Sequence, residues 1–312
     1  MFKISTQLNS KNEFKIILID EGSKFHDLKN FLDIEICNKL KKKALSNKKQ
    51  FAFISKYTSS RLVNYYFYKI DKNKIDFEYQ DIGGSIISQA LEISENNLEI
   101  NFNFLSTYLK NNSNFLKNLI IGIMSKNYHF DNYKIKKNSK KIKNISLISE
   151  NSSLLKSCFQ YAKNINDGIT ETRNLVTAPA NILNPQNFVN VIKKLSKIGL
   201  KIEILNEDRL KKLGMNALLG VGQGSSNKSF VAIMKWNGGK KNSKPLGFVG
   251  KGVCFDTGGI SLKPARFMEE MKYDMAGAGT VTGLMKTLAL RKARVNAVGV
   301  VGLVENMPDG NA

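Results

Sequence analysis

A glycine-punctuated stretch rich in reactive side chains, residues 250–279, constrains the fold of this chain more than any other segment. Its sequence is GKGVCFDTGGISLKPARFMEEMKYDMAGAG. The apolar run from Pro245 to Val249 just before it has the length of a buried strand in a parallel sheet, and Gly250 and Gly252 are predicted to end that strand. Because open α/β sheets bind ligands where their strands end, we expect an α/β fold with a functional site at this point of the chain.

Two lysines and two aspartates of this stretch are the candidate site residues: Lys251, Asp256, Lys263 and Asp274. Two carboxylates and a neutral lysine amine can hold a divalent metal, while a second, charged lysine polarises a substrate carbonyl. A lysine amine binds metal only when burial and a neighbouring cation lower its pKa well below about 10.4. The alternative is a surface loop whose solvated ion pairs contribute about 0 to 1 kcal/mol each. Spacing alone leaves both interpretations open.

Four segments, in order along the chain, resemble motifs of the leucyl aminopeptidase family, the M17 cytosol aminopeptidases. They are RNLVTAPANILNPQNF from Arg173, MNALLGVGQGS from Met215, GKGVCFDTGGISLKP from Gly250 and MKYDMAGAG from Met271. The resemblance implies a metal-dependent exopeptidase with two divalent ions, Mn²⁺ or Zn²⁺, in each subunit. It also implies intracellular peptide turnover, peptide substrates with a free N-terminus, a preference for leucine and assembly into a homo-hexamer.

Position by position, the same resemblance assigns a role to each candidate residue. Lys251 and Asp274 resemble ligands of the second metal, and Asp256 resembles the carboxylate that bridges both metals. Lys263 resembles the catalytic lysine that polarises the scissile carbonyl and stabilises the tetrahedral oxyanion. The resemblance assigns no other cofactor-binding residue.

One departure from the family pattern concerns the rest of its metal site. The family completes that site with an NTDAEGR-like segment, which also carries a catalytic arginine, and no such segment occurs among the 312 residues. The sequence VENMPDGNA from Val304 resembles the family's sequence shortly before that motif. We therefore expect a catalytic domain that lacks its carboxy-terminal part. A catalytically inactive fragment of such an enzyme is the alternative.

The charge of the chain raises a second alternative, a DNA-binding accessory protein. Lysine and arginine number 48 against 26 aspartate and glutamate residues, and a formal net charge of +22 favours anionic partners. However, lysine, asparagine and isoleucine are abundant throughout, which is typical of a compositional bias. The aromatic run Tyr65–Lys69 could stack bases, although a strand with aromatic residues on both faces explains it more simply. Some bacterial members of the resembled family bind DNA through their amino-terminal domains.

Other site classes find little support in the sequence. The three cysteines lie far apart, which argues against a disulfide framework and a structural zinc site, and Cys254 is expected to serve packing. The glycines from Gly220 to Gly224 are too closely spaced for the dinucleotide fingerprint, so a nucleotide-binding α/β protein is a weaker alternative. No secretory leader and no apolar run of about 18 residues occurs, which predicts a cytoplasmic protein without a membrane partner.

Hydrophobic periodicity predicts two domains. We expect a small α/β amino-terminal domain at residues 1–150, a linker helix at 151–172, and an incomplete catalytic domain at 173–312. The catalytic domain is expected to be a three-layer α/β/α structure with a mixed, mostly parallel sheet. Finer expectations are helices at 81–91 and 107–119, a strand at 119–124, and strands at 229–236 and 245–249 that could form an antiparallel pair.

Overall fold

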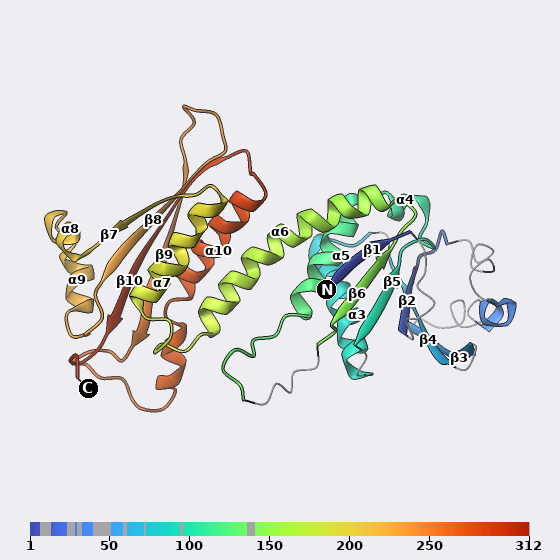
Figure 1. Ribbon diagram of the computed structural model, residues 1–312, viewed down its shortest axis with the longest axis horizontal. Helices are drawn as coiled ribbons and strands as arrows, with labels where there is room; N and C mark the ends of the chain where they lie inside the picture. Colours follow the sequence, from blue (N-terminus) through green and yellow to red (C-terminus); the bar gives the residue numbers. More distant parts are fainter. Residues whose placement is uncertain are drawn as a thin grey trace. The chain divides into compact units, whose positions relative to one another are not determined.

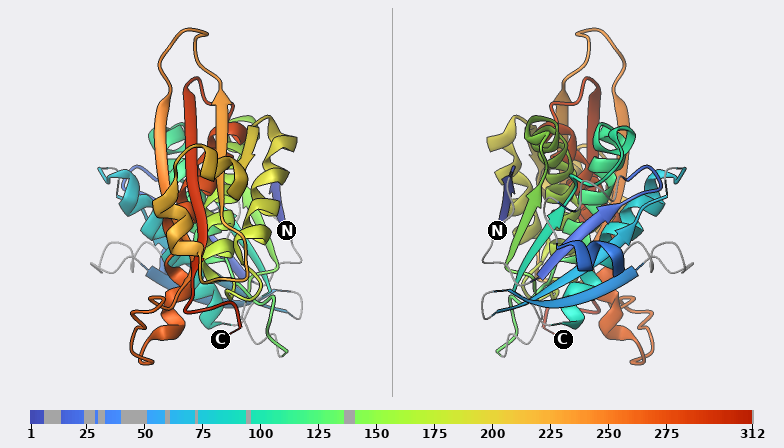
Figure 2. Two further views of the ribbon diagram at one scale, coloured as in Figure 1. Left: turned by 90° about the vertical axis from the view of Figure 1, so that its left-hand side faces the viewer. Right: turned by 90° about the vertical axis from the view of Figure 1, so that its right-hand side faces the viewer.

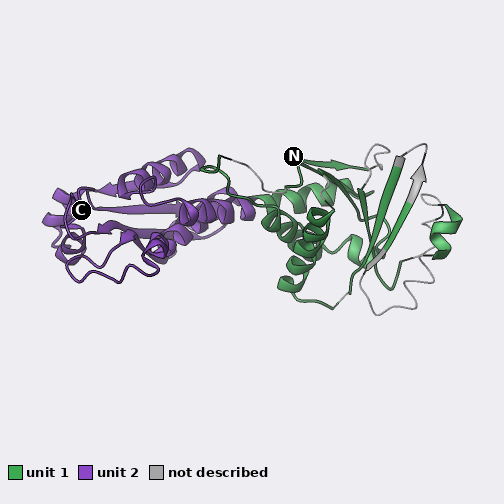
Figure 3. Ribbon diagram, turned by 90° about the horizontal axis from the view of Figure 1, so that it is seen from below, with its two compact units in different colours: residues 1–163 green, residues 164–312 purple. Residues whose placement is uncertain are grey.

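The computed structural model describes most of the chain. The described residues are 1–6, 14–23, 29, 33–39, 51–58, 61–71, 73–93, 96–135 and 141–311. The chain divides into two compact units, Met1–Lys163 and Asn164–Ala312, which Figure 3 colours separately. Helix α6, Ser152–Thr177, contributes residues to both units. The domain boundaries at residues 150 and 172 stay a prediction.

The first unit is built on a six-stranded sheet whose order is β1-β6-β5-β2-β4-β3 (Figure 1). Its pairings are parallel except that β3 runs antiparallel to β4. The strands are β1 Phe2–Ser5, β2 Phe14–Ile19, β3 Phe51–Thr58, β4 Arg61–Lys69, β5 Asn97–Asn101 and β6 Asn144–Ile148. The helices between β4 and β6 are α3 Asp76–Glu92, α4 Thr107–Lys110 and α5 Ser113–Lys126.

The structure corrects two expectations for the helices of this unit. Helix α3 begins at Asp76 and not at Asp81, because the Glu78 side chain accepts a hydrogen bond from the Ile75 N–H and so satisfies a free donor at the helix start. The strand expected at 119–124 is wrong, since these residues lie inside α5. Residues 119–124 are all buried, and a helix that is apolar on every side cannot be told from a strand by its periodicity.

The aromatic residues of β4 serve the core of the first unit. Phe67 and Tyr68, which point to opposite faces of the sheet, are both buried. Tyr66 packs against the rings of Phe14 and Phe53 at centroid distances of 4.8 and 4.6 Å. Because β4 is paired on both sides and its aromatic rings pack on both faces, sheet packing accounts for this run of residues.

The second unit contains a mixed four-stranded sheet in the order β7-β8-β10-β9. Its strands are β7 Lys201–Leu205, β8 Phe230–Asn237, β9 Leu246–Asp256 and β10 Asn296–Asn306. The pairing of β9 with β10 is parallel, whereas β7–β8 and β8–β10 are antiparallel, so this part of the domain is not mostly parallel as expected. The suggested antiparallel pair of β8 and β9 is also wrong, because β10 lies between them.

Helices cover both faces of the second sheet, which confirms the three-layer α/β/α arrangement (Figure 1). Helices α7, Pro185–Lys194, and α10, Ala276–Leu290, pack on one face around Phe188, Met234 and Met285. Helices α8, Glu207–Lys212, and α9, Asn216–Gly222, cover the other face. The β8–β9 connection projects beyond one end of the sheet, and the β9–α10 connection lies at the opposite end with the last described residues (Figure 2).

Helices α6 and α10 touch at two glycines. A Cβ on Gly283 would stand 2.1 Å from Thr172 Oγ1 and 2.5 Å from the Gly168 carbonyl oxygen. Thr172 Oγ1 donates a hydrogen bond to the Gly279 carbonyl at 3.1 Å, and Lys286 pairs with Glu171 at 2.6 Å. The end of α6 is therefore held directly against α10 within the second unit.

We predict that Gly283→Ala destabilises the second unit by about 1–3 kcal/mol, because the added methyl group overpacks this helix contact. Urea unfolding followed by the fluorescence of Trp236, the single tryptophan of the chain, measures the effect in this unit. Gly220→Ala in α9 is the matched control, since its Cβ would meet no atom within 4 Å and helix propensity favours it by about 0.5–1 kcal/mol. Equal stability of the two variants would contradict the prediction.

Candidate functional site

The candidate site is formed by β9 and by the connection from β9 to α10. Contrary to the expectation that Gly250 and Gly252 end the strand, β9 continues to Asp256. The glycines are needed for a different reason, because α10 packs directly against the strand. A Cβ on Gly250 would stand 2.7 Å from the Gly277 carbonyl oxygen. Lys251 therefore lies within the strand, and Asp256 lies at its end.

The connection after β9 turns back and brings Lys263 beside Asp256. The Thr257 N–H and hydroxyl both donate to the carbonyl oxygen of Asn306, at 2.9 and 2.7 Å. The Lys263 N–H in turn donates to the Thr257 carbonyl at 2.9 Å. These bonds anchor the loop to the end of β10. A short 3-10 helix, Met268–Tyr273, then leads to Asp274 at the start of α10.

In the structure the four predicted residues form two ion pairs. Lys263 Nζ lies 2.6 Å from Asp256 Oδ2, and Lys251 Nζ lies 2.7 Å from Asp274 Oδ1. The two carboxylates are mostly buried, with 16% and 21% of their side chains exposed, whereas Lys251 is 62% exposed. Each pair therefore joins a half-buried carboxylate to a lysine that solvent reaches.

Asn306 completes the surroundings of Asp256, although the sequence did not single it out. Its side-chain amide donates to Asp256 Oδ1 at 2.7 Å, and the Gly258 N–H donates to the same oxygen at 3.0 Å. Asn306 is the last residue of β10 and the register partner of Asp256 in the parallel pair. The parallel pairing of these two strands is the signal that could have indicated Asn306, because the carboxyl ends of adjacent parallel strands lie side by side.

Burial and hydrogen bonding act on Asp256 in opposite directions. Burial raises the pKa of Asp256, but the hydrogen bond from Lys263, the bonds from Gly258 and Asn306, and the charge of Lys263 outweigh it. The pKa of Asp256 therefore lies below the ordinary value of 3.8. Asp256 is an anion at neutral pH, the form in which a carboxyl group binds a metal ion.

A second buried carboxylate that the sequence did not reveal, Glu305, lies next to Asn306 on β10. Its Oε2 accepts hydrogen bonds from Ser225 Oγ and Asn227 Nδ2, both at 2.8 Å. The charge of Glu305 adds to burial in raising the pKa of the Cys254 thiol. Cys254 is therefore a neutral thiol within the apolar core, in line with a packing role.

The donors at this site suit a divalent metal ion in part. Asp274 Oδ2 is buried without a hydrogen-bond partner among the described residues, an arrangement that is costly unless a cation approaches. Carboxylate oxygens and an amine are donors that Mn²⁺ and Zn²⁺ accept. Within the described ranges, however, no three His, Cys, Asp or Glu side chains gather as a metal-binding group. Asp256, Asp274 and Lys251 are too few donors for two ions, and the Lys251 side chain, which is 62% exposed, lacks the burial expected of a metal-binding amine.

Comparison with known proteins identifies the catalytic domain. Residues 170–312 match the profile described as cytosol aminopeptidase family, catalytic domain. This part of the chain belongs to the M17 cytosol aminopeptidase family. A probable cytosol aminopeptidase of Brucella anthropi is 52% identical over 200 residues, which are 62% of this chain and 40% of that protein. One from Phytoplasma australiense is 50% identical over 206 residues, 65% of this chain and 42% of that protein. The chain thus spans less than half the length of these M17 relatives.

Solved structures share the fold over nearly the whole chain. The bottromycin maturation enzyme BotP in complex with Mn superposes with a TM-score of 0.70 at 19% identity, over 96% of this chain and 61% of that one. The cytosol aminopeptidase of Coxiella burnetii gives 0.69 at 21% identity, over 98% and 61%. At these identities the likeness establishes the fold, and it confirms the α/β class expected for an M17 protein.

Two further expectations bear on this M17 chain. The glycine-rich turn at Gly222–Ser225 follows helix α9 and precedes strand β8, whereas phosphate-binding glycine loops follow a strand and open a helix. Its position therefore gives no support to the nucleotide-binding alternative. None of the helices in the described part of the chain has the length and apolar character needed to cross a membrane.

We predict that Lys263→Met raises the pKa of Asp256, because it removes a hydrogen bond and a positive charge while burial remains. A carboxylate whose folded pKa is lowered stabilises the protein above its unfolded pKa, and this contribution is lost as pH falls through the folded pKa. The difference in unfolding free energy between wild type and variant should therefore shrink as pH falls below 3.8. Titration of the Asp256 carboxyl carbon by NMR gives the pKa directly.

Lys244→Met is the control for this experiment, since Lys244 is an exposed lysine of the same unit. It should leave the titration of Asp256 unchanged. An unchanged Asp256 pKa in Lys263→Met would show that the ion pair does not form in solution.

Proposed function

We propose that this chain carries the lysine-bearing part of a metal-dependent aminopeptidase active site, which releases N-terminal amino acids, preferably leucine, from peptides. The observation that carries the proposal is the Lys263 ammonium held 2.6 Å from the half-buried carboxylate of Asp256, in a chain whose residues 170–312 match the M17 family. This pair supports the proposal, because a charged lysine beside an anionic carboxylate would stabilise an oxyanion that develops next to a metal ion held there.

In this proposal, Lys251, Asp256 and Asp274 would help to hold two divalent ions, Mn²⁺ or Zn²⁺, in each subunit of the complete protein. The Mn named with BotP supports the choice of metal. When bound, such ions polarise the scissile carbonyl and make a water molecule nucleophilic at neutral pH. The remaining ligands and the catalytic arginine belong to the NTDAEGR-like segment of the family, which these 312 residues do not contain.

Lys263 can bind the substrate while it stays paired with Asp256. Its ammonium donates to Asp256 Oδ2 and also lies 3.0 Å from Met271 Sδ. Because an ammonium group has three N–H donors, one remains for the carbonyl oxygen of the substrate. Asn306 and the Gly258 N–H hold the other oxygen of Asp256, so the carboxylate keeps its orientation.

The partners and location proposed for the complete protein follow from its M17 membership. The substrates are peptides with a free N-terminus, the protein assembles as a homo-hexamer, and it works in the cytoplasm in peptide turnover. The name of the relatives, probable cytosol aminopeptidase, supports the location and the reaction class.

The activity test uses leucine p-nitroanilide with added Mn²⁺. We compare the 312-residue chain with a chimera in which it is continued by the remaining sequence of the Brucella anthropi relative. Hydrolysis by the chimera is expected, with lower or no turnover by the 312-residue chain, because three donors are too few for two ions. In the chimera, Lys263→Ala should lower kcat/KM by about 10²–10³-fold and leave the bound Mn²⁺ in place.

Lys244→Ala serves as the control, because it removes an exposed lysine outside the site. Near-normal turnover of the Lys263→Ala chimera would contradict the proposal that Lys263 stabilises the oxyanion. An inactive chimera that binds Mn²⁺ and unfolds cooperatively would reject the proposed reaction.

Metal binding gives a test that does not depend on turnover. Asp274→Asn should weaken the binding of Mn²⁺ to the 312-residue chain by at least about 10–100-fold, because it replaces an anionic ligand with a neutral amide. Isothermal titration calorimetry measures the affinity. Asp208→Asn makes the same charge change at an exposed residue of α8 and should have no effect. Equal affinities of the two variants would exclude Asp274 as a ligand.

A further inference from the structure

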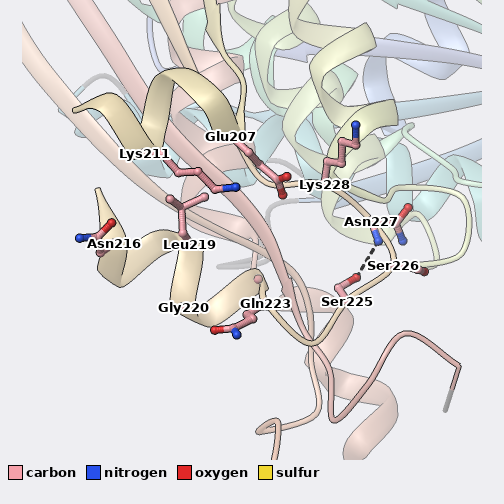
Figure 4. Close-up of a pocket in the computed structure, with 11 residues that line it drawn as sticks. Glu207, Lys211, Asn216, Leu219, Gly220, Gln223, Ser225, Ser226, Asn227 and Lys228 are labelled. Atoms are coloured by element: carbon pink, nitrogen blue, oxygen red, sulfur yellow. Dashed lines mark hydrogen bonds between the residues drawn. The ribbon is translucent and has the colours of Figure 1, made fainter. Parts of the chain in front are cut away.

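A groove of about 650 Å³ lies outside the candidate site, between α8, α9 and the turn of residues 222–228. Figure 4 shows its walls: Glu207 and Lys211 extend from α8, Asn216 and Gln223 lie along and after α9, and Lys228 comes from the turn. These side chains are polar or charged, with Leu219 as an apolar contact. The M17 motifs and the proposed reaction use none of the charged residues of this groove.

The turn that forms one wall is held in place by close packing. A Cβ on Gly224 would stand 2.1 Å from the Met307 carbonyl oxygen, so the backbone of the turn touches the segment that follows β10. Ser225 and Asn227 direct their side chains inward to Glu305, and the Asn227 N–H donates to Ser225 Oγ at 3.0 Å (Figure 4). The groove is therefore preformed, which lowers the entropic cost of binding a ligand.

The charges along the groove are two cations and one carboxylate. Lys211 and Lys228 are exposed, and neither makes an ion pair with any described residue. Glu207 is only partly exposed, and its Oε1 accepts the Ser229 N–H at 2.9 Å, which leaves Oε2 to accept from another donor. The groove is thus lined by two lysine side chains, either of which can reach an oxyanion, and by one carboxylate oxygen that can accept from a hydroxyl or amine.

We propose that this groove binds a small molecule that carries a phosphate or carboxylate group, held by Lys211 and Lys228, and a hydroxyl or amine that donates to Glu207. The amides of Asn216 and Gln223 supply further hydrogen bonds. Lysine side chains provide the anion contacts here. This site therefore differs from a phosphate loop, in which the backbone N–H groups of a glycine-rich turn at a helix start bind the phosphate.

The experiment measures binding of three probes to the full 312-residue chain by isothermal titration calorimetry at constant ionic strength. The probes are inorganic phosphate, glycerol 3-phosphate and L-leucine, which separate a bare oxyanion from a hydroxylated phosphate and from an amino-carboxylate. We expect saturable binding of at least one hydroxyl- or amine-bearing probe at millimolar concentrations. The double variant Lys211→Ala/Lys228→Ala should weaken this binding by at least about tenfold.

Two control variants make the result specific. Lys240→Ala/Lys241→Ala removes the same charge from exposed lysines between β8 and β9 and should leave binding unchanged, which controls for the high positive charge of the chain. Glu207→Gln, which can still accept the Ser229 N–H, should weaken glycerol 3-phosphate or L-leucine but not inorganic phosphate. Exposed lysines contribute little to folding, so circular dichroism should be the same for all variants.

Two outcomes would overturn the proposal. One is the absence of saturable binding for all three probes at millimolar concentrations. The other is an equal loss of binding in both double-lysine variants, which would show that the net charge of the chain, and not the groove, accounts for the binding. Because calorimetry without a peptide substrate is the readout, failure here is distinguishable from failure of the proposed peptidase function.

Discussion

The direct packing of strand β9 against helix α10 is the constraint on which the candidate site depends. Gly250, on the strand, and Gly277, near the helix start, let the two backbones meet, since a Cβ on Gly250 would stand 2.7 Å from the Gly277 carbonyl oxygen. This contact places Lys251, next to Gly250, within reach of Asp274, just before the helix, and the two side chains pair at 2.7 Å. With side chains at these glycines, the helix would move outward and the pair would separate.

The second constraint is the parallel pairing of β9 with β10, which determines the environment of Asp256. The register places Asn306 opposite Asp256, and the Asn306 carbonyl also anchors the loop that returns with Lys263. One carboxylate oxygen is held by neutral donors and the other by an ammonium group. The neutral donors thus fix the orientation of the carboxylate independently of its charged partner.

The same end of β10 connects the candidate site to the rest of the second unit. Glu305 precedes Asn306 and binds Ser225 and Asn227, which belong to the turn that walls the groove over α8 and α9. A buried carboxylate held by two neutral donors is costly to disturb, because the loss of a donor would leave a buried charged oxygen without that hydrogen bond and without water to replace it. These hydrogen bonds therefore connect the turn that walls the groove to the end of β10.

Local patterns in the sequence were sufficient for part of this description. Three features were predicted from the sequence. They are the choice of Lys251, Asp256, Lys263 and Asp274 as candidate site residues, their likeness to the M17 motifs, and the α/β class with a three-layer second unit. The predictions of secondary structure were wrong where one sequence pattern fits two different structures. The apolar run Leu119–Met124 suits a strand or a buried helix, and glycines in β9 can end a strand or admit a helix.

The sequence by itself determined which chemical groups this protein has and how far apart they lie along the chain, because motif identity and hydrophobic periodicity are local properties. Only the tertiary structure decided that β10 lies between β8 and β9, that each aspartate pairs with a particular lysine, and that Asn306 and Glu305 surround the site. These facts depend on strand register and on contacts between segments up to about 80 residues apart, which no local pattern encodes.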